Sequence, residues 1–471
     1  MELSALTVME ARRALDAKKF SARELTEAYL KEIALRDPDI HAYLEVWAET
    51  ALAEAQEADE RIREGNALSL TGIPVAIKDN ILIKGRHASA ASKILESYVA
   101  SYDATVTTKL KNEGAVFLGR ANMDEFALGS STENSAYGVT KNPYDTSRVA
   151  GGTSGGPAAA VAANMALVGL GSDTGGSIRQ PAALCGVVGL KPTYGAVSRF
   201  GLMAAASSLD QIGPIGKTVG DVEAVFNAIR GHDTNDSTSL PDTAVYVKKP
   251  KVIGVPRAFV SSGVEKDVSL RFESVLNNLR KAGYEIRDIE LPNLTYSLAV
   301  YYIINPAEVS TNLARFDGIR YGLSEPAETI GDVYTKTRGR GFGPEARRRI
   351  LVGTFVLSSG YADAYYRKAR AVRSLVREDF KKAFESVDAV ATPTSPIPAF
   401  KIGEKSDDPL AMYAADIFTV PVNLAGVPAI SVPAGTVTRD GKELPVGFQA
   451  IGSHGGEEML FTIGKDIEQT R

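Results

Sequence analysis

Residues 151–190 read GGTSGGPAAAVAANMALVGLGSDTGGSIRQPAALCGVVGL, and this stretch decides the class of fold. Glycine-rich strings at 151–156 and 174–176 lie on either side of a helix-forming segment at 157–165 and an apolar run at 167–170. A second apolar run follows at 186–190. Pro157 suits the first turn of a helix, and glycine lets a backbone turn sharply or approach a ligand closely. The pattern predicts buried strands and a helix joined by ordered glycine turns.

The same alternation extends upstream of this stretch. Apolar runs at 74–77 and 115–118 predict buried strands, and 103–112 predicts a helix that ends at Gly114. The first 66 residues differ, because they predict helices alone. Ser21 and Glu24 have the spacing of a capping box, and a second helix is expected at 39–64.

A polar stretch at 231–243 predicts a linker or a long surface loop, and the alternation then resumes. Strands are expected at 251–255, 285–289, 388–391, 429–432 and 446–451, and helices at 265–282, 297–315, 344–384 and from 457 onward. Because the texture is the same on both sides of the polar stretch, one composite core is favoured over two independent domains. We therefore expect a single large α/β/α domain over 1–471, with a mixed, mainly parallel central sheet covered by helices on both faces. Its parts are a helical segment at 1–66, a core at 70–210 and a second half at 250–471.

The composition indicates a globular enzyme of the cytoplasm. Hydrophobic residues make up 44% of the 471 residues and charged residues 23%, which allows a large core. The formal net charge of −4 gives no overall basic field for nucleic acid. We find no secretion signal at the N-terminus and no apolar run of eighteen residues, so we expect neither export nor a membrane span. Cys185 is the single cysteine, which excludes an internal disulfide and a cysteine-based metal cage.

Hydroxyl groups on ordered glycine turns suggest nucleophilic catalysis, which needs a base beside the hydroxyl. None of the four histidines lies near the glycine strings in sequence: His41, His87, His232 and His454. Lys78, at the end of the apolar run 73–78, is the alternative base. A free lysine has a pKa near ~10.4, but burial lowers it toward the range suited to proton transfer. The plainer interpretation is a surface lysine at a strand end, paired with Asp79.

Other interpretations of the glycine strings meet specific difficulties. No Lys-Ser or Lys-Thr follows, as a phosphate-binding P-loop requires, and residues 169–174 have threonine where the dinucleotide fingerprint needs its third glycine. Residues 152–156 satisfy G-x-S-x-G, the nucleophile elbow of α/β-hydrolases, with Ser154 as the nucleophile. That elbow needs a strand just before Gly152, where 142–150 predicts a loop, and a later histidine, for which only His454 is suitable.

Three strings together resemble the amidase signature family: PVAIKDN at 74–80, GGTSGG at 151–156 and TGGSIRQPA at 174–182. Members of that family hydrolyse or transfer carboxamides with a Ser–Ser–Lys triad, and the signature block covers roughly 70–210. The resemblance implies Ser177 as the acylated nucleophile, Lys78 as the general base and residue 153 as the bridging hydroxyl. It also implies that the backbone N–H groups of Thr174, Gly175, Gly176 and Ser177 form the oxyanion hole.

At position 153 this chain departs from the family pattern, because it has threonine where the family has serine. In the family the bridging residue follows a cis peptide bond. Thr153 keeps the hydroxyl but adds a methyl group that restricts its side-chain rotation. We expect Thr153 to relay the proton, with Ser154 as the alternative. The family's serine at position 157 is replaced by proline, which is harmless at a helix start.

Strings at 312–321, 341–350, 358–366 and 418–426 are similar to one branch of the family, the amidase subunits of tRNA-dependent amidotransferases. This resemblance implies a glutaminase in which Arg349 binds the α-carboxylate of glutamine and Asp416 its α-ammonium, with Arg348 as an alternative to Arg349. It implies a heterotrimer with subunits B and C, and tRNA bound mainly by the partner subunit. ATP and Mg²⁺ are expected at the partner, whereas this chain is expected to bind no cofactor or metal.

The sequence leaves the tRNA acceptor open between Glu-tRNA(Gln) and Asp-tRNA(Asn). A free-standing amidase acting on another carboxamide would share Lys78, Thr153 and Ser177 but would need neither a glutamine clamp nor partner chains. A non-enzymatic scaffold would follow if Thr153 disabled the proton relay. The intact pair of Lys78 and Ser177 favours an enzyme over a scaffold.

Overall fold

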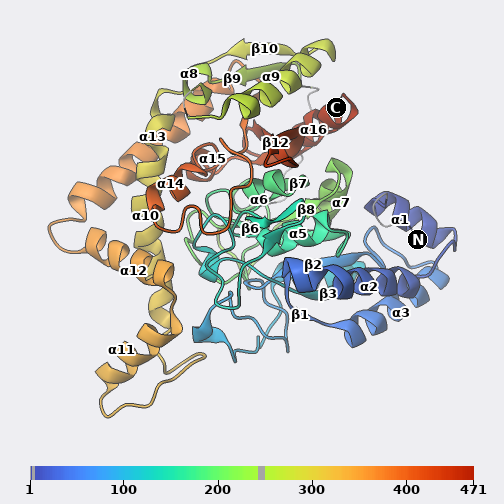
Figure 1. The fold of residues 1–471 in the computed structure, drawn as a ribbon, viewed down its shortest axis with the longest axis horizontal. Helices are drawn as coiled ribbons and strands as arrows, with labels where there is room; N and C mark the ends of the chain where they lie inside the picture. The colour runs from blue at the N-terminus through green and yellow to red at the C-terminus, as the bar shows by residue number, and fades with distance from the viewer. Residues whose placement is uncertain (1, 3–5, 242–249, 262, 471) are drawn as a thin grey trace.

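One eleven-stranded sheet runs through the fold in the computed structural model, which describes residues 2, 6–241, 250–261 and 263–470. Its strand order is β1-β3-β2-β6-β8-β7-β12-β13-β11-β9-β10, so both halves of the chain share it, and β4 and β5 form a separate small sheet (Figure 1). The strands are β1 (Tyr43–Val46), β2 (Pro74–Lys78), β3 (Val116–Ala121), β4 (Lys141–Asn142), β5 (Asp145–Val149), β6 (Val168–Asp173), β7 (Val188–Lys191), β8 (Gln211–Gly216), β9 (Val252–Val255), β10 (Glu285–Asp288), β11 (Ala389–Pro393), β12 (Ala429–Arg439) and β13 (Lys442–Gly452).

Helices surround this sheet. They are α1 (Val8–Asp16), α2 (Ala22–Ile40), α3 (Ala48–Arg63), α4 (Thr105–Glu113), α5 (Gly155–Ala162), α6 (Arg179–Leu184), α7 (Val219–Ile229), α8 (Arg257–Val260), α9 (Lys266–Lys281), α10 (Ser297–Asn312), α11 (Ile330–Gly341), α12 (Pro344–Leu357), α13 (Lys368–Ala383), α14 (Pro409–Ala414), α15 (Val420–Ala425) and α16 (Glu457–Gln469). Every residue of β2, β6, β7, β8 and β11 is buried, so both faces of these strands are covered. The expected single α/β domain with a mixed sheet is confirmed.

The expectation that the sheet is mainly parallel is wrong. Parallel pairs form two blocks, β3-β2-β6 and β11-β9-β10. The strands between these blocks pair antiparallel, as does the edge strand β1 with β3. The reason is that β8 doubles back between β6 and β7, and that β12 and β13 form a long hairpin instead of two strands separated by a helix.

The N-terminal segment is helical except for one short strand. The capping box at Ser21 is present, with its hydroxyl accepting from the backbone N–H of Glu24 at 3.0 Å. The predicted helix at 39–64 is interrupted, because α2 ends at Ile40, where His41 adopts a left-handed conformation with φ of 58°. Residues 43–46 then pair with β3 as β1, a contact with a distant segment that no local pattern indicates.

Further along the chain the predicted elements are present with shifted ends. The predicted helix at 344–384 is divided into α12 and α13 by a turn around Gly360, whose φ is 85°. The polar stretch at 231–241 forms hydrogen-bonded turns, in which Asp233 accepts from Ser198 and Asp236 from the backbone of Arg199. Residues 242 and 243 of the predicted linker lie outside the described residues. Among the described helices none is both long and apolar enough to cross a membrane.

Two parallel neighbours position the site. Because β2 and β6 pair in parallel, with Ile77 opposite Leu170, their carboxyl ends meet at one edge of the sheet. Lys78 ends β2, and the glycine loop 174–177 follows β6. Helix α5 starts at Gly155 and packs against both strands, which brings residues 153 and 154 to the same edge.

Candidate active site

Lys78 is the last residue of β2, and its side chain has no exposed surface. Burial lowers the pKa of its amine to about 7, because an ammonium loses its hydration there. Nearby carboxylates, led by Asp124, favour the charged form without offsetting that loss. Near neutral pH a substantial fraction of Lys78 is therefore the free base. The interpretation as a surface lysine paired with Asp79 is wrong, because Asp79 instead pairs with Arg120 at 3.0 Å.

Hydroxyl groups surround the amine of Lys78. Its Nζ lies 2.8 Å from Oγ1 of Thr153 and 2.8 Å from Oγ of Ser154. Ser172, which no sequence pattern singled out, adds its Oγ at 3.0 Å and its carbonyl oxygen at 3.2 Å. The Gly152–Thr153 peptide bond is cis, as the family resemblance implied. Lys78 and Thr153, two of the three predicted catalytic residues, are in direct contact.

Thr153 and Ser154 are equally close to Lys78, but their other contacts differ. The Ser154 hydroxyl also bonds the main chain of Ser172, donating to its carbonyl oxygen at 3.1 Å. The Thr153 hydroxyl has Lys78 as its one hydrogen-bond partner among the described residues. A hydroxyl in that position keeps a free valence for a third group. The geometry therefore favours Thr153 over Ser154 as the side chain able to pass a proton onward.

Ser177 lies in the loop between β6 and α6 and is 6% exposed. Its carbonyl oxygen accepts a hydrogen bond from the backbone N–H of Ser154 at 3.0 Å, which ties this loop to the segment that carries Thr153. Within the part of the chain that the structure describes, the Ser177 hydroxyl makes no hydrogen bond. The relay from Ser177 to Thr153 stays a prediction.

The loop before Ser177 requires glycine at two positions. A Cβ at Gly175 would lie 2.7 Å from the ring of Tyr301. Gly176 has φ of +140°, and a Cβ there would lie 2.2 Å from Oγ1 of Thr419. Both the backbone conformation and the lack of space therefore exclude larger residues.

Not all of the predicted oxyanion-hole N–H groups are free. Gly176 donates its N–H to Oδ1 of Asp173 at 2.9 Å, so this group is already used. The N–H groups of Thr174, Gly175 and Ser177 have no acceptor among the described residues. These three are the better candidates to stabilise a developing negative charge.

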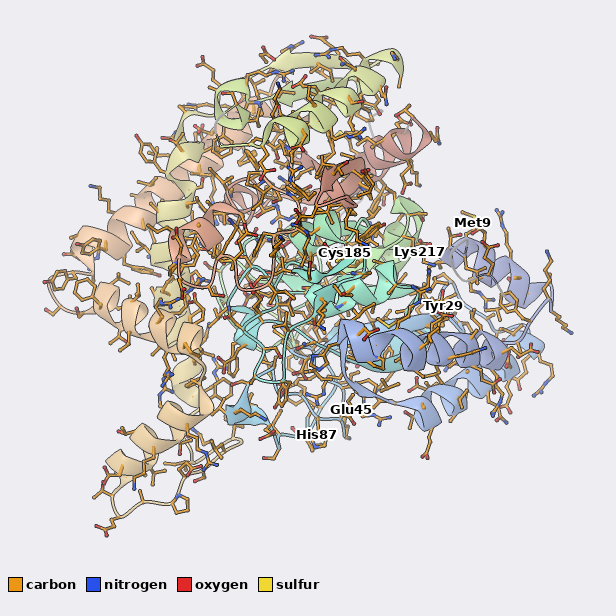
Figure 2. All side chains as sticks on the ribbon, viewed as in Figure 1. Met9, Tyr29, Glu45, His87, Cys185 and Lys217 are labelled. Atoms are coloured by element: carbon orange, nitrogen blue, oxygen red, sulfur yellow. The ribbon has the colours of Figure 1, made fainter. Side chains whose placement is uncertain are left out.

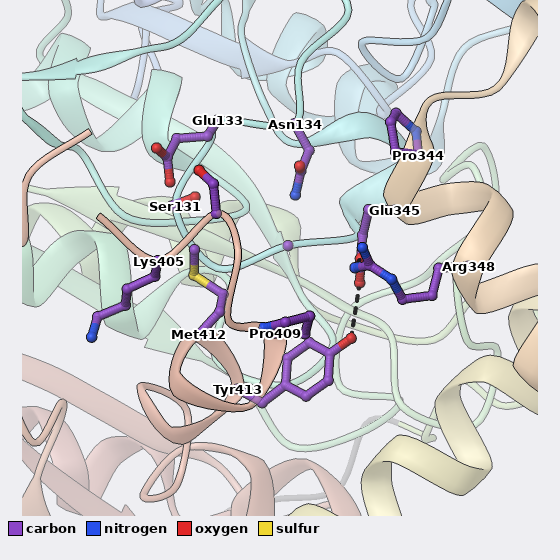
Figure 3. Close-up of a pocket in the computed structure, with 12 residues that line it drawn as sticks. Ser131, Glu133, Asn134, Pro344, Glu345, Arg348, Lys405, Pro409, Met412 and Tyr413 are labelled. Carbon is purple, nitrogen blue, oxygen red and sulfur yellow. Dashed lines mark hydrogen bonds and ion pairs between the residues drawn. The ribbon is translucent and has the colours of Figure 1, made fainter. Parts of the chain in front are cut away.

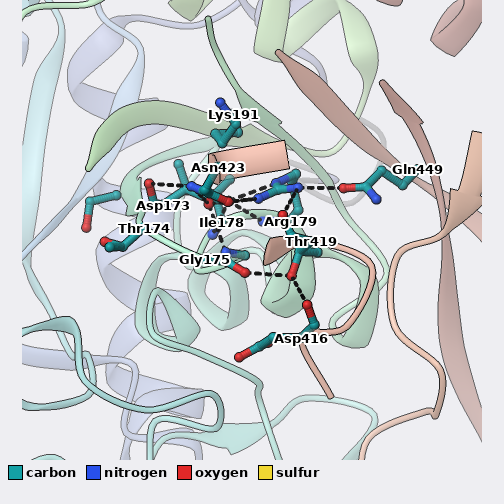
Figure 4. Close-up of polar contacts among 12 residues, drawn as sticks. Asp173, Thr174, Gly175, Ile178, Arg179, Lys191, Asp416, Thr419, Asn423 and Gln449 are labelled. Atoms are coloured by element: carbon teal, nitrogen blue, oxygen red, sulfur yellow. Dashed lines mark hydrogen bonds and ion pairs between the residues drawn. The ribbon is translucent and has the colours of Figure 1, made fainter. Parts of the chain in front are cut away.

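A buried ion pair supports the loop from below (Figure 4). Arg179 contacts Asp173 with two nitrogens, Nη2 to Oδ1 at 2.9 Å and Nε to Oδ2 at 3.0 Å. Burial alone would raise the pKa of Asp173, but the Arg179 guanidinium outweighs it and holds that pKa well below its usual range. Asn423 and Gln449 accept further hydrogen bonds from Arg179, each at 2.6 Å. Sequence reasoning missed these supports, although a charged pair inside an otherwise apolar segment was an available signal.

Arg349 and Asp416, the predicted glutamine clamps, are buried near the loop. Arg349 on α12 donates from Nε to Glu345 at 2.7 Å and from Nη1 to Asn305 at 2.9 Å. Asp416 accepts from the hydroxyl of Ser130, and burial raises the pKa of Asp416 to about 7 although this hydrogen bond opposes the rise. The electrostatic influence of Arg349 reaches Asp416 as well, so the two side chains belong to one charged environment.

Thr419 connects Asp416 to the nucleophile loop. Its hydroxyl lies 2.6 Å from the carbonyl oxygen of Gly175 and 3.1 Å from that of Asp416 (Figure 4). The clamp and the loop are thereby held at a fixed separation.

Arg348, the alternative to Arg349, lies in the wall of a pocket of about 150 Å³ (Figure 3). It pairs with Glu345, which also accepts from the hydroxyl of Tyr413 at 3.2 Å. Arg349 is 4% exposed and lies between the rings of Tyr302 and Tyr413, at 4.7 and 5.0 Å from their centroids. Arg349 is thus held from both sides, whereas Arg348 is more exposed at the pocket wall.

The family described as Amidase matches residues 24–461 of the chain. This chain belongs to the amidase family. The A chain of the glutamyl-tRNA(Gln) amidotransferase from Caldanaerobacter subterraneus subsp. tengcongensis is 53% identical over 477 residues, covering 100% of this chain and 97% of that protein. The predicted membership of this enzyme family, and the resemblance to its tRNA-amidotransferase branch, are both confirmed.

Solved amidase structures share the fold. The corresponding glutamyl-tRNA(Gln) amidotransferase chain of Thermotoga maritima matches with a TM-score of 0.81 at 42% identity, covering 100% of this chain and 95% of that one. The native peptide amidase of Stenotrophomonas maltophilia matches with a TM-score of 0.82 at 31% identity, covering 99% and 97%. The fold is thus common to both kinds of amidase, and the higher identity lies with the amidotransferase proteins.

The elbow interpretation does not fit this amidase. The strand nearest to Gly152, β5, belongs to the small sheet and not to the central one. His454 is half-buried beside Gly426, whereas the hydroxyl of Ser154 contacts Lys78. Cys185, the single cysteine, is buried in the middle of the molecule (Figure 2).

Proposed function

We propose that this amidase is the glutaminase subunit of a tRNA-dependent amidotransferase. The observation that carries the proposal is the buried amine of Lys78, 2.8 Å from the hydroxyl of Thr153, at the sheet edge that also bears Ser177. In this proposal neutral Lys78 takes the proton of Thr153 while Thr153 takes that of Ser177. The Ser177 oxygen then forms a bond to the side-chain amide carbon of glutamine.

Two further steps complete the reaction. The tetrahedral intermediate collapses as Lys78 returns its proton through Thr153 to the amide nitrogen, and ammonia leaves. Water then attacks the acyl-enzyme, giving its proton to Lys78 through Thr153, and the ester bond breaks to release glutamate and restore the Ser177 hydroxyl. Free N–H groups of Thr174, Gly175 and Ser177 stabilise the oxyanion in both intermediates. Arg349 pairs with the α-carboxylate of glutamine and Asp416 with its α-ammonium.

In the assembled enzyme the ammonia passes to a partner that amidates Glu-tRNA(Gln) or Asp-tRNA(Asn). Subunits B and C complete the heterotrimer, and the partner binds ATP, Mg²⁺ and most of the tRNA. The amidotransferase relatives, each of which is the A component of a glutamyl-tRNA(Gln) amidotransferase, support this assignment and a place in the cytoplasm with the rest of translation.

Ammonia release from glutamine tests the proposal, with the chain expressed alone and together with subunits B and C. We expect glutamine to be hydrolysed and Ser177→Ala to abolish the hydrolysis. The second candidate is a free-standing amidase, which the match to the peptide amidase favours. It predicts instead that peptide amides are hydrolysed by the chain alone and that glutamine is not.

A further inference from the structure

One face of α13 carries arginines in succession. Arg370, Arg373 and Arg377 follow one another at intervals of three and four residues, the spacing of neighbours along one helix face. They line an open hollow of about 690 Å³ together with Ser208, Glu308 and Tyr366. Neither Lys78 nor Ser177 belongs to this hollow, so it is separate from the active site.

The hollow has an excess of positive charge. Its one carboxylate in the described chain, Glu308, already accepts from the N–H and the hydroxyl of Ser208, at 2.8 and 2.6 Å. Arg370, Arg373 and Arg377 form no ion pair with any residue that the structure describes. Like charges at these intervals repel one another on a helix, so the arrangement is unfavourable without an anion.

Arg373 is built into the floor of the hollow and is 9% exposed. Its guanidinium donates to three neutral oxygens: the carbonyl of Leu424 at 2.9 Å, the hydroxyl of Ser208 at 2.7 Å and the carbonyl of Ser208 at 2.8 Å. Arg377 donates to the same Leu424 carbonyl at 3.2 Å. Burial, and then the proximity of Arg377, lower the pKa of Arg373 to about 10. Two cations therefore converge on one oxygen with no acid between them.

We propose that this hollow is a binding site for a phosphate group. Arginine guanidinium groups match the oxygens of phosphate in geometry as well as charge, and a bound anion would relieve the repulsion among the three cations. The volume of the hollow exceeds what a lone phosphate ion fills, which leaves room for the rest of a phosphoester. Two sources supply this chemistry, a small phosphorylated molecule and the phosphodiester backbone of RNA.

Calorimetric titration of the full chain with pyrophosphate tests the site, with sodium chloride at equal ionic strength as the reference. We expect saturable binding, and a dissociation constant about 10-fold higher in Arg370→Gln and in Arg377→Gln, as for the loss of one charged hydrogen bond. Lys382→Gln is the matched control, because it removes one charge from an exposed position on the same helix and should leave binding unchanged. Binding no stronger than the chloride effect, or equal losses in all three variants, would overturn the proposal.

A second arm identifies the source of the phosphate. If RNA supplies it, unmodified tRNA binds the chain, and the Arg370→Gln/Arg377→Gln double variant lowers the salt dependence of binding by about 0.9 per lost phosphate contact. If a small molecule supplies it, the double variant loses pyrophosphate while its tRNA binding matches the unaltered chain. Glutamine hydrolysis should persist in the double variant, so failure of this site is distinguishable from failure of the proposed glutaminase.

Discussion

The amine of Lys78 and the hydroxyl of Thr153 lie 2.8 Å apart, and neither side chain has any exposed surface. A buried amine with a pKa of about 7 next to a hydroxyl is suited to take a proton at neutral pH. The family places serine at position 153, so this chain raises the question of what the additional methyl group does.

We expect the hydroxyl of Thr153 to matter and its methyl group not to. Thr153→Ser should retain the glutaminase rate within a few-fold, whereas Thr153→Val, of similar shape without the hydroxyl, should lower it by about 10²–10⁴-fold, as for a lost acid–base group. Ser154→Ala is the matched control and should cost far less, because the Ser154 hydroxyl is already held by Ser172. Steady-state ammonia release measures all three. A larger loss in Ser154→Ala than in Thr153→Val would assign the relay to Ser154.

The ion pair between Asp173 and Arg179 should dominate the stability of the loop. Arg179→Met leaves a carboxylate buried without its partner, and we expect a loss of about 3–5 kcal/mol in the free energy of unfolding. Arg367→Gln, which breaks an exposed pair with Asp363 at 3.0 Å, should cost about 0–1 kcal/mol. Urea denaturation compares the two variants. Similar losses in both would show that burial of the Asp173 pair has no special role.

The glycines of the nucleophile loop should differ from glycines elsewhere. Gly176→Ala places a methyl group against Thr419 and strains the backbone, so we expect glutaminase activity to fall sharply. Gly339→Ala in α11 meets nothing within 4 Å and should stabilise the chain by about 0.5–1 kcal/mol without affecting activity. Activity assays with thermal unfolding separate these effects. Full activity in Gly176→Ala would contradict the account of the loop.

The two neighbouring arginines should contribute unequally to glutamine binding. Arg349 is fixed by Glu345 and Asn305, so Arg349→Gln should raise KM for glutamine about 10–100-fold, as for a lost charged hydrogen bond. Arg348→Gln removes the same charge from the pocket wall and should raise KM less than about 3-fold. Initial rates over a range of glutamine concentrations decide between them. The reverse order would assign the carboxylate to Arg348.

Much of the site could be predicted from the sequence because its signals are local. The apolar run before Lys78 and the glycine strings identified the strand, the turns and the edge of the sheet at which they meet. The strand β8 was missed because Gly213, Pro214 and Gly216 are unusual in strands, and its place is set by pairing with β6 and β7. The support of Arg179 was missed because Asn423 and Gln449 lie more than 240 residues away in the chain.

The rate at which Ser177 is acylated, followed by mass spectrometry across pH 5.5–9 with an electrophilic glutamine analogue, tests the central claim most directly. Only the free amine of Lys78 accepts a proton, so the rate should rise with pH, reach half of its plateau near the pKa of about 7 and then level off. Lys78→Met should abolish the rise, while Ser154→Ala should keep it. A rate that does not change with pH, or an adduct on Ser154 in place of Ser177, would contradict the account.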